Sequence, residues 1–148
     1  MNELLKRPHP AIVHFPISLF PISLVFLILY WARDNVFFLN ASFWCFVFGA
    51  VMLIPVAVTG FLDMIRLKSH SLEAHKSLNL HMLNGILITL LALSGGLYFF
   101  LNSPMRDPSL LPAYSLLMGV LSLLVAFQGY IGAVMVYRQH LGVDGDTR

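Results

Sequence analysis

Four long apolar stretches constrain this chain more than any other feature of its sequence. They cover about residues 11–32, 43–62, 78–101 and 111–137, and the formal charges lie at their ends or between them. Each stretch has the ~20 residues that an α-helix needs to cross a bilayer core of about 30 Å. Backbone groups in lipid must bond within their own segment, and continuous apolarity is not the alternating pattern of a β-barrel strand. The sequence therefore predicts an all-α, integral membrane four-helix bundle that forms a single domain over residues 1–148.

The composition supports this class and excludes several others. Hydrophobic residues make up 58% of the chain and charged residues only 11%, whereas a soluble domain carries about 25% charged residues. The single cysteine, Cys45, excludes an intrachain disulfide, a Cys-rich metal site and covalent haem attachment. The sequence contains no phosphate-binding loop, nucleophile elbow, dinucleotide fingerprint or nucleic-acid-binding patch. We therefore expect the lipid bilayer as the main partner, and no nucleic acid.

The distribution of basic residues predicts the orientation of the bundle. With four spans, both termini and the connection between the second and third spans lie on one side of the membrane. Seven basic residues belong to that side, namely Lys6, Arg7, Arg66, Lys68, Lys76, Arg138 and Arg148. The other side holds only Arg33 and Arg106, and each is followed by an aspartate. Because basic residues concentrate on the cytoplasmic side, both termini are predicted to be cytoplasmic.

The histidines all fall on that same predicted cytoplasmic side. The six are His9, His14, His70, His75, His81 and His140. Imidazole at the edge of a membrane can ligate haem iron, bind a transition metal, relay protons or bond a quinone oxygen. His9, His70 and His140 lie outside the spans. An amphipathic side chain is stable at a membrane interface without binding a ligand, and we favour that interpretation for these three. His14, His75 and His81 are the stronger candidates, provided that they point into the bundle.

The spacing of polar residues on the third span separates two faces. His75 and Asn79 are four residues apart, so they share one face of a helix. His81 lies about 120° away from His75, so the two are not expected to serve one site. A second polar stripe comprises Ser77, His81, Asn84 and Gly85.

Gln128 is the most notable polar residue of the fourth span. It lies beside Gly129 and Gly132, and glycines let transmembrane helices approach closely. We expect Gln128 to form hydrogen bonds between helices rather than to bind a substrate.

Two sets of ligands follow from the positions of these residues. His14 with His75 would offer one imidazole on each of two helices at similar shallow depth, which suits a non-covalent haem. Alternatively, His14, Asp63 and His75 make a mixed nitrogen and oxygen set for a divalent metal. The carboxylate separates the two hypotheses, because axial ligation of haem has no need of Asp63.

Three stretches of the chain resemble one known family. They are His9-Pro10-Ala11-Ile12-Val13-His14-Phe15-Pro16-Ile17, Thr59-Gly60-Phe61-Leu62-Asp63 and Ala74-His75-Lys76-Ser77-Leu78-Asn79. They resemble the uncharacterised bacterial membrane family called domain of unknown function 2231, and Gly129 to Val143 is a looser match to its ending. The family's pattern corresponds here to His9, His14, Asp63, His75 and Asn79, with His81 outside it.

The resemblance carries several implications. It implies a location in the bacterial cytoplasmic (inner) membrane. The family's layout is also distantly similar to that of membrane b-type cytochrome bundles, which implies haem binding through residues such as His14, His75, Asn79 and His9. Histidines at only one depth would allow one haem of that kind.

Three hypotheses for function result. The first is a protein that binds one b-type haem near the cytoplasmic face and exchanges electrons with a quinone or a redox partner protein. The second is a non-enzymatic membrane subunit, or a protein that senses or handles a metal through His14, Asp63 and His75. The third, a transporter, is the weakest, because the spans carry almost no ionisable group near the midplane.

Overall fold

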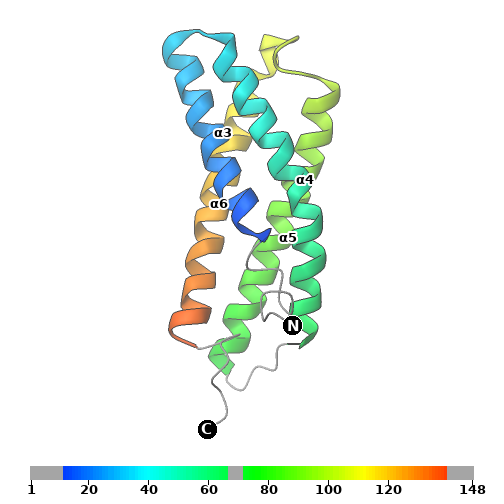
Figure 1. The fold of residues 1–148 in the computed structure, drawn as a ribbon, viewed down its shortest axis with the longest axis vertical. Coiled ribbons are helices and arrows are strands. Elements are labelled where there is room, and N and C mark those ends of the chain that lie inside the picture. Colours follow the sequence, from blue (N-terminus) through cyan, green and yellow to red (C-terminus); the bar gives the residue numbers. More distant parts are fainter. Residues whose placement is uncertain (1–11, 67–71, 140–148) are drawn as a thin grey trace, which may run out of the picture.

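The structure, a computed structural model, describes residues 12–66 and 72–139 of the chain. Within those ranges it contains four long α-helices that run up and down side by side (Figure 1). They are α3 (His14–Arg33), α4 (Val36–Arg66), α5 (Leu72–Leu101) and α6 (Leu111–Tyr137), with a short 3₁₀ helix η1 (Pro108–Leu110) before α6. All four are long and apolar enough to cross a membrane. The predicted all-α four-helix architecture is confirmed.

The four helices form a ring in which each packs mainly against two others. α3 packs against α4 and α6, and α5 packs against the same two helices. Consecutive helices are therefore antiparallel neighbours, and α6 closes the ring against α3. As a result, α3 and α5 lie diagonally across the bundle from each other.

The turn between α3 and α4 is tighter than the sequence indicated. Only Asp34 and Asn35 separate the two helices, whereas the second span was predicted to begin at residue 43. Asp34 adopts a left-handed conformation with φ 48°, and its N–H donates to the carbonyl of Tyr30 at 2.8 Å. Oδ1 of Asn35 accepts from the N–H of Phe37 at 2.9 Å and so caps α4. Polar Asn40 does not delay the helix, because its amide donates to the carbonyl of Val36 within the same helix.

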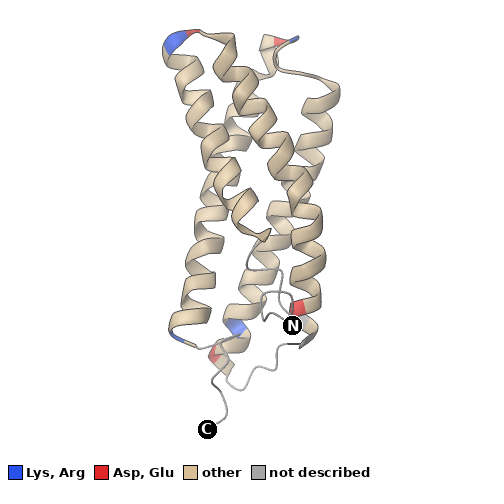
Figure 2. Ribbon diagram, viewed as in Figure 1, with Lys and Arg blue, Asp and Glu red and all other residues tan. Residues whose placement is uncertain are grey.

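The helices also extend beyond the apolar stretches at the other end of the bundle. α4 continues to Arg66 and α5 begins at Leu72, six residues before the predicted start at residue 78. The connection between them is thus shorter than the predicted segment from Asp63 to Ser77. Charged residues such as Lys76 are helical and still lie at the end of the bundle, as Figure 2 shows for all the described charges.

α3 is the short member of the bundle. It has 20 residues, against 31 in α4 and 30 in α5. At 1.5 Å per residue, α3 is about 30 Å long and α4 about 46 Å. α3 therefore covers about two-thirds of the length of α4, and the other helices project beyond its first residue (Figure 1). Pro16 lies in the first turn of α3, where a missing N–H costs nothing.

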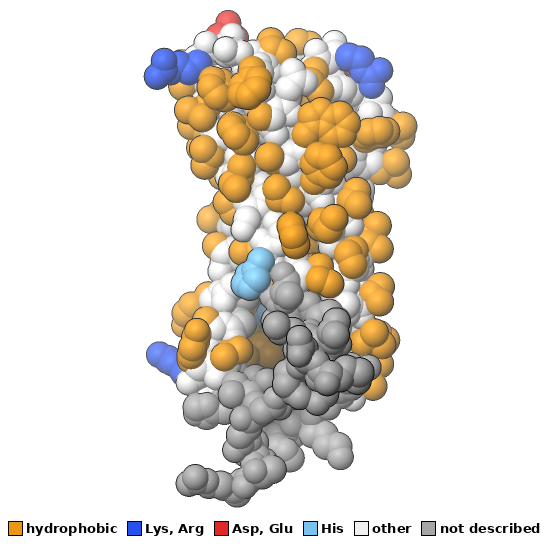
Figure 3. Space-filling view, viewed as in Figure 1, with side chains coloured by type: hydrophobic (Ala, Val, Ile, Leu, Met, Phe, Trp, Pro, Cys, Tyr) orange, Lys and Arg blue, Asp and Glu red, His pale blue; other side chains and the backbone are white. Residues whose placement is uncertain are grey.

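Aromatic side chains form the centre of the core. Phe20, Phe46 and Tyr114 are completely buried, and their rings pack in sequence with centroid separations of 6.3 and 5.8 Å. Phe99 adds an edge contact to Tyr114 at 5.3 Å. Most of the remaining large apolar side chains point outward instead, and they cover the sides of the molecule in Figure 3. An apolar exterior with charges at both ends is the arrangement that a bilayer requires.

Candidate functional site

Three of the six histidines lie within the described residues, namely His14, His75 and His81. The candidate His9, together with His70 and His140, lies outside the described ranges. The site can therefore be built only from the three described histidines and their neighbours.

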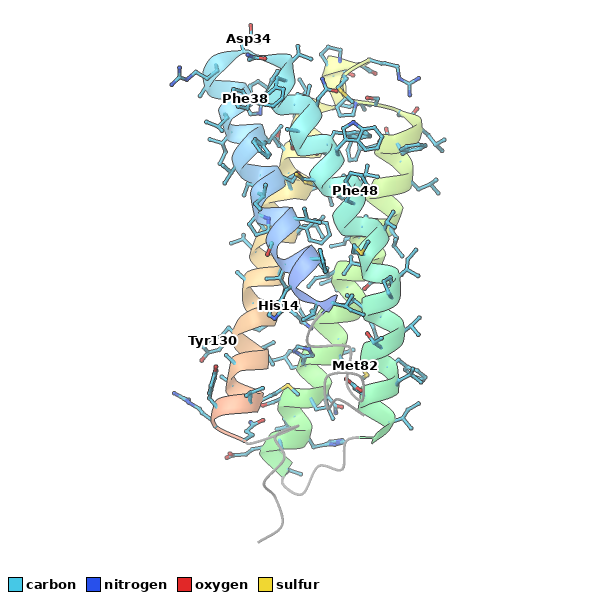
Figure 4. All side chains as sticks on the ribbon, in the orientation of Figure 1. His14, Asp34, Phe38, Phe48, Met82 and Tyr130 are labelled. Carbon is cyan, nitrogen blue, oxygen red and sulfur yellow. The ribbon has the colours of Figure 1, made fainter. Side chains whose placement is uncertain are left out.

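The depth of each histidine follows from the bounds of its helix. α3 and α5 finish at the same end of the bundle, at Arg33 and Leu101 (Figure 1). His14 is the first residue of α3, so it lies about 30 Å from that end, and Figure 4 shows it far above the lower end of α5. Along α5, His81 lies about 30 Å from Leu101 and His75 about 39 Å from it. Figure 4 shows His14 above Met82, the residue that follows His81. The predicted partners His14 and His75 thus lie at different depths, and His75 is about 9 Å further from His14 along the bundle than His81 is.

The exposure of each side chain identifies the face of α5 that points inward. His75 and Asn79 do share a face, as their spacing predicts, but both side chains are exposed. His81 is half-buried, and the next residues along its face, Asn84 and Ile88, are buried. His81, which the family pattern leaves out, is therefore the histidine of α5 that points into the bundle.

The structure does not gather the predicted metal ligands. Asp63 is half-buried near the end of α4, and His14 and His75 are exposed on two other helices. Within residues 12–66 and 72–139, no three His, Cys, Asp or Glu side chains come together as they would at a metal ion. The metal site of His14, Asp63 and His75 stays a prediction that the geometry does not favour.

A network of amide hydrogen bonds joins α5 to α6 beside His81. The side-chain amide of Asn84 donates to Oε1 of Gln128 at 2.7 Å and to the carbonyl of Leu124 at 3.0 Å. The amide of Gln128 in turn donates to the backbone carbonyl of His81 at 3.0 Å. The prediction that Gln128 bonds between helices is confirmed. The network fixes the rotation of α5 against α6, and hence the direction in which His81 points.

Glycines let the two helices approach at this level. A Cβ atom on Gly132 would lie 3.6 Å from Cε1 of His81, so the imidazole packs against the backbone of α6. A Cβ atom on Gly85 would lie 3.3 Å from Nε2 of Gln128. Gly129 is different, because it is exposed and nothing lies within 4 Å of its Cβ position.

A second polar cluster lies in the other half of the bundle and was not found from the sequence. Ser23 of α3 donates to the carbonyl of Ser42 on α4 at 2.8 Å, and the two hydroxyls are 3.0 Å apart. The hydroxyl of Tyr114 on α6 lies 3.0 Å from that of Ser42, and all three side chains are completely buried. The available signal was the spacing of Ser23 with Pro16, Phe20 and Leu27, which are buried on the same face of α3. The cluster is satisfied internally and ties three helices together.

The comparison with protein families matches nearly the whole of this architecture. The family described as "Predicted membrane protein (DUF2231)" matches residues 7–145. The chain belongs to this family. The match includes all four helices and every described histidine. No curated protein and no solved structure matches the chain.

Membership of the DUF2231 family agrees with the membrane-spanning architecture and adds no activity, because the family's description names none. The distant similarity to b-type cytochrome bundles stays a prediction. The chemistry of the site must therefore be argued from its own residues.

Proposed function

We propose that this membrane protein binds one b-type haem in the histidine-containing half of the bundle and exchanges electrons with a quinone or a redox partner protein. The axial ligands in this proposal are His14 and His81. The observation that carries it is that these two imidazoles come from diagonal helices in the same half of the bundle. His81 replaces His75 as the second ligand because its side chain is half-buried, whereas the side chain of His75 is exposed, as that of His14 also is.

The residues around His81 suit an axial ligand. A ligating imidazole needs its ring held in one orientation. The packing of the ring against Gly132, together with the bond from Gln128 to the His81 carbonyl, supplies that restraint. Nδ1 of His81 is buried beside Gly132 of α6. A bound haem would supply one-electron redox chemistry, and the chain's own residues would hold and orient it.

The depth of the pair suits a haem at the edge of the bilayer. The apolar span of α6 continues past Gly132, against which His81 packs, to Tyr137, so His14 and His81 lie inside the span near its histidine-containing end. Lys76 and Arg138 lie beyond them at the same end of the bundle. Cationic side chains there would pair with the two propionates.

We also propose that this end is cytoplasmic and that the protein resides in a bacterial inner membrane. The asymmetry of Lys and Arg between the two ends supports the orientation. The bacterial location rests on the resemblance described above.

The decisive experiment is an absorption spectrum of the detergent-purified protein, oxidised and then reduced with dithionite, from cells supplied with iron and a haem precursor. We expect a sharp reduced α band and a shifted Soret band. His14→Ala and His81→Ala should each abolish them, while His75→Ala should leave them unchanged. Circular dichroism of each variant would verify that the helices are retained.

Each other outcome has a definite meaning. Loss of haem in His75→Ala with retention in His81→Ala would restore the original pairing of His14 with His75 and overturn the one proposed. A featureless spectrum of the fully helical wild-type protein would overturn haem binding altogether. Elemental analysis of the same sample would then test the remaining alternative, a metal-handling or non-enzymatic subunit.

A further inference from the structure

The outer face of α6 carries a depression near the histidine-containing end of the bundle. It has a volume of about 190 Å³ and is lined by Tyr130, Ala133, Val134, Tyr137 and Arg138. We propose that it binds one anionic phospholipid, with the phosphate at Arg138 and an acyl chain in the depression. This inference is independent of haem binding, because it uses none of the histidines.

The position of the depression matches the level of lipid headgroups. It covers the last two turns of α6, where the apolar span finishes and the first charged residue, Arg138, follows. Tyr130 is 64% exposed and Tyr137 is 80% exposed, and Figure 4 shows Tyr130 pointing away from the bundle. Tyrosines at this level present an apolar ring to the acyl chains and a hydroxyl to the headgroups.

The charge at the depression is positive and uncompensated by described residues. Within residues 12–66 and 72–139, no hydrogen bond or ion pair engages the guanidinium of Arg138 or the hydroxyls of Tyr130 and Tyr137. Arg106, at the opposite end of the bundle, has both a hydrogen bond and a neighbouring acidic residue. Its guanidinium donates to the carbonyl of Leu101 at 3.0 Å, and Asp107 follows it in the chain. A phosphate at Arg138 would gain a charge-assisted hydrogen bond that Arg106 is less free to offer.

The shape of the depression favours a lipid over a free anion. The depression is shallow and open, and its lining is mostly apolar, from Tyr130, Ala133, Val134 and Tyr137. Toward the midplane, the same face of α6 continues with small exposed residues at Gly129 and Ala126. An acyl chain can lie along this apolar face next to its own headgroup, whereas inorganic phosphate would contact only Arg138.

The test is native mass spectrometry of delipidated protein titrated with phosphatidylglycerol or phosphatidylcholine of identical acyl chains. We expect about a tenfold preference for phosphatidylglycerol, because both lipids carry a phosphate but the choline cation of phosphatidylcholine cancels its charge. Arg138→Gln should remove this preference, and the matched control Arg106→Gln should keep it. Ala133→Leu should reduce binding of both lipids by filling the depression, whereas Ala57→Leu, on the exposed face of α4, should not.

Three results would overturn the proposal. Equal retention of the two lipids by the wild-type protein would indicate non-specific surrounding lipid only. Equal effects of Arg138→Gln and Arg106→Gln would indicate attraction to net charge rather than a site. Displacement of phosphatidylglycerol by millimolar inorganic phosphate would indicate a site that recognises the phosphate group alone, with no contribution from the acyl chain.

Discussion

At the scale of single residues, Gln128 is the side chain on which the candidate site most depends. It accepts from Asn84 and donates to the carbonyl of His81, so it links two polar residues of α5 through one residue of α6. Its burial in an apolar surrounding makes each of these bonds costly to leave unmade. The residue therefore stabilises the bundle and orients the imidazole at once.

Gln128→Leu should lower the free energy of unfolding by about 0.5–1.5 kcal/mol, the range measured for hydrogen bonds between transmembrane helices. The matched control is Ser94→Ala, because the Ser94 hydroxyl bonds only to carbonyls of its own helix, at 2.6 and 3.4 Å. Reversible unfolding in mixed micelles with sodium dodecyl sulfate, followed by circular dichroism, would measure both. Equal losses of unfolding free energy in the two variants would show that the hydrogen bonds between α5 and α6 stabilise the bundle no more than a bond within one helix.

At the scale of elements, the short length of α3 explains the geometry of the site. Because α3 begins at His14, its first turn lies opposite the middle of α5 rather than its start. His14 therefore lies closer in depth to His81 than to His75. The position of α3 is in turn set by close packing against α4, where Phe20 meets the backbone of Gly49.

Gly49→Ala tests that packing. The added Cβ would lie 2.8 Å from Cε1 of Phe20, and the ring is completely buried against Phe46, so it cannot move aside. We expect a loss of about 1–3 kcal/mol in the free energy of unfolding. Gly119→Ala is the control, since nothing lies within 4 Å of its Cβ position, and it should change stability by less than about 0.5 kcal/mol. Similar values for both variants would contradict close packing of α3 on α4 at Gly49.

At the scale of the whole molecule, the two ends of the bundle differ in charge and in chemistry. All the described histidines lie in one half of the bundle, and Lys76 and Arg138 lie at the end of that half. The opposite end carries Arg33 and Arg106, each followed by an aspartate. The side of the membrane that each end faces therefore decides from which compartment the proposed haem site could be reached.

The positive-inside distribution predicts that the histidine end is cytoplasmic. Green fluorescent protein fused after Arg148 should fluoresce, and alkaline phosphatase fused there should be inactive. Alkaline phosphatase inserted in the loop after Asp107 should be active, because that loop lies at the opposite end. The reverse pattern would place the histidines outside the cytoplasm and exclude a cytoplasmic redox partner.

The class of this protein was decided by its sequence alone. Four apolar stretches of sufficient length leave no fold but a membrane helical bundle, because unpaired backbone groups are too costly in lipid. Placing the histidines in one half of the molecule needed only the number of spans. The bonding role of Gln128 could also be predicted, because an amide between glycines in an apolar span has few other uses.

The identity of the inward-facing histidine was decided only by the tertiary structure. Spacing gives the angle between His75 and His81, but the rotation of α5 depends on contacts with α6, such as the bond from Asn84 to Gln128. Spacing likewise gives no depth for His14 until the start of α3 is known. The buried cluster of Ser23, Ser42 and Tyr114 was also decided only by the tertiary structure, because its members come from three different helices. Apolar length acts within each segment and can be seen in the sequence, whereas rotation and register arise from packing between segments.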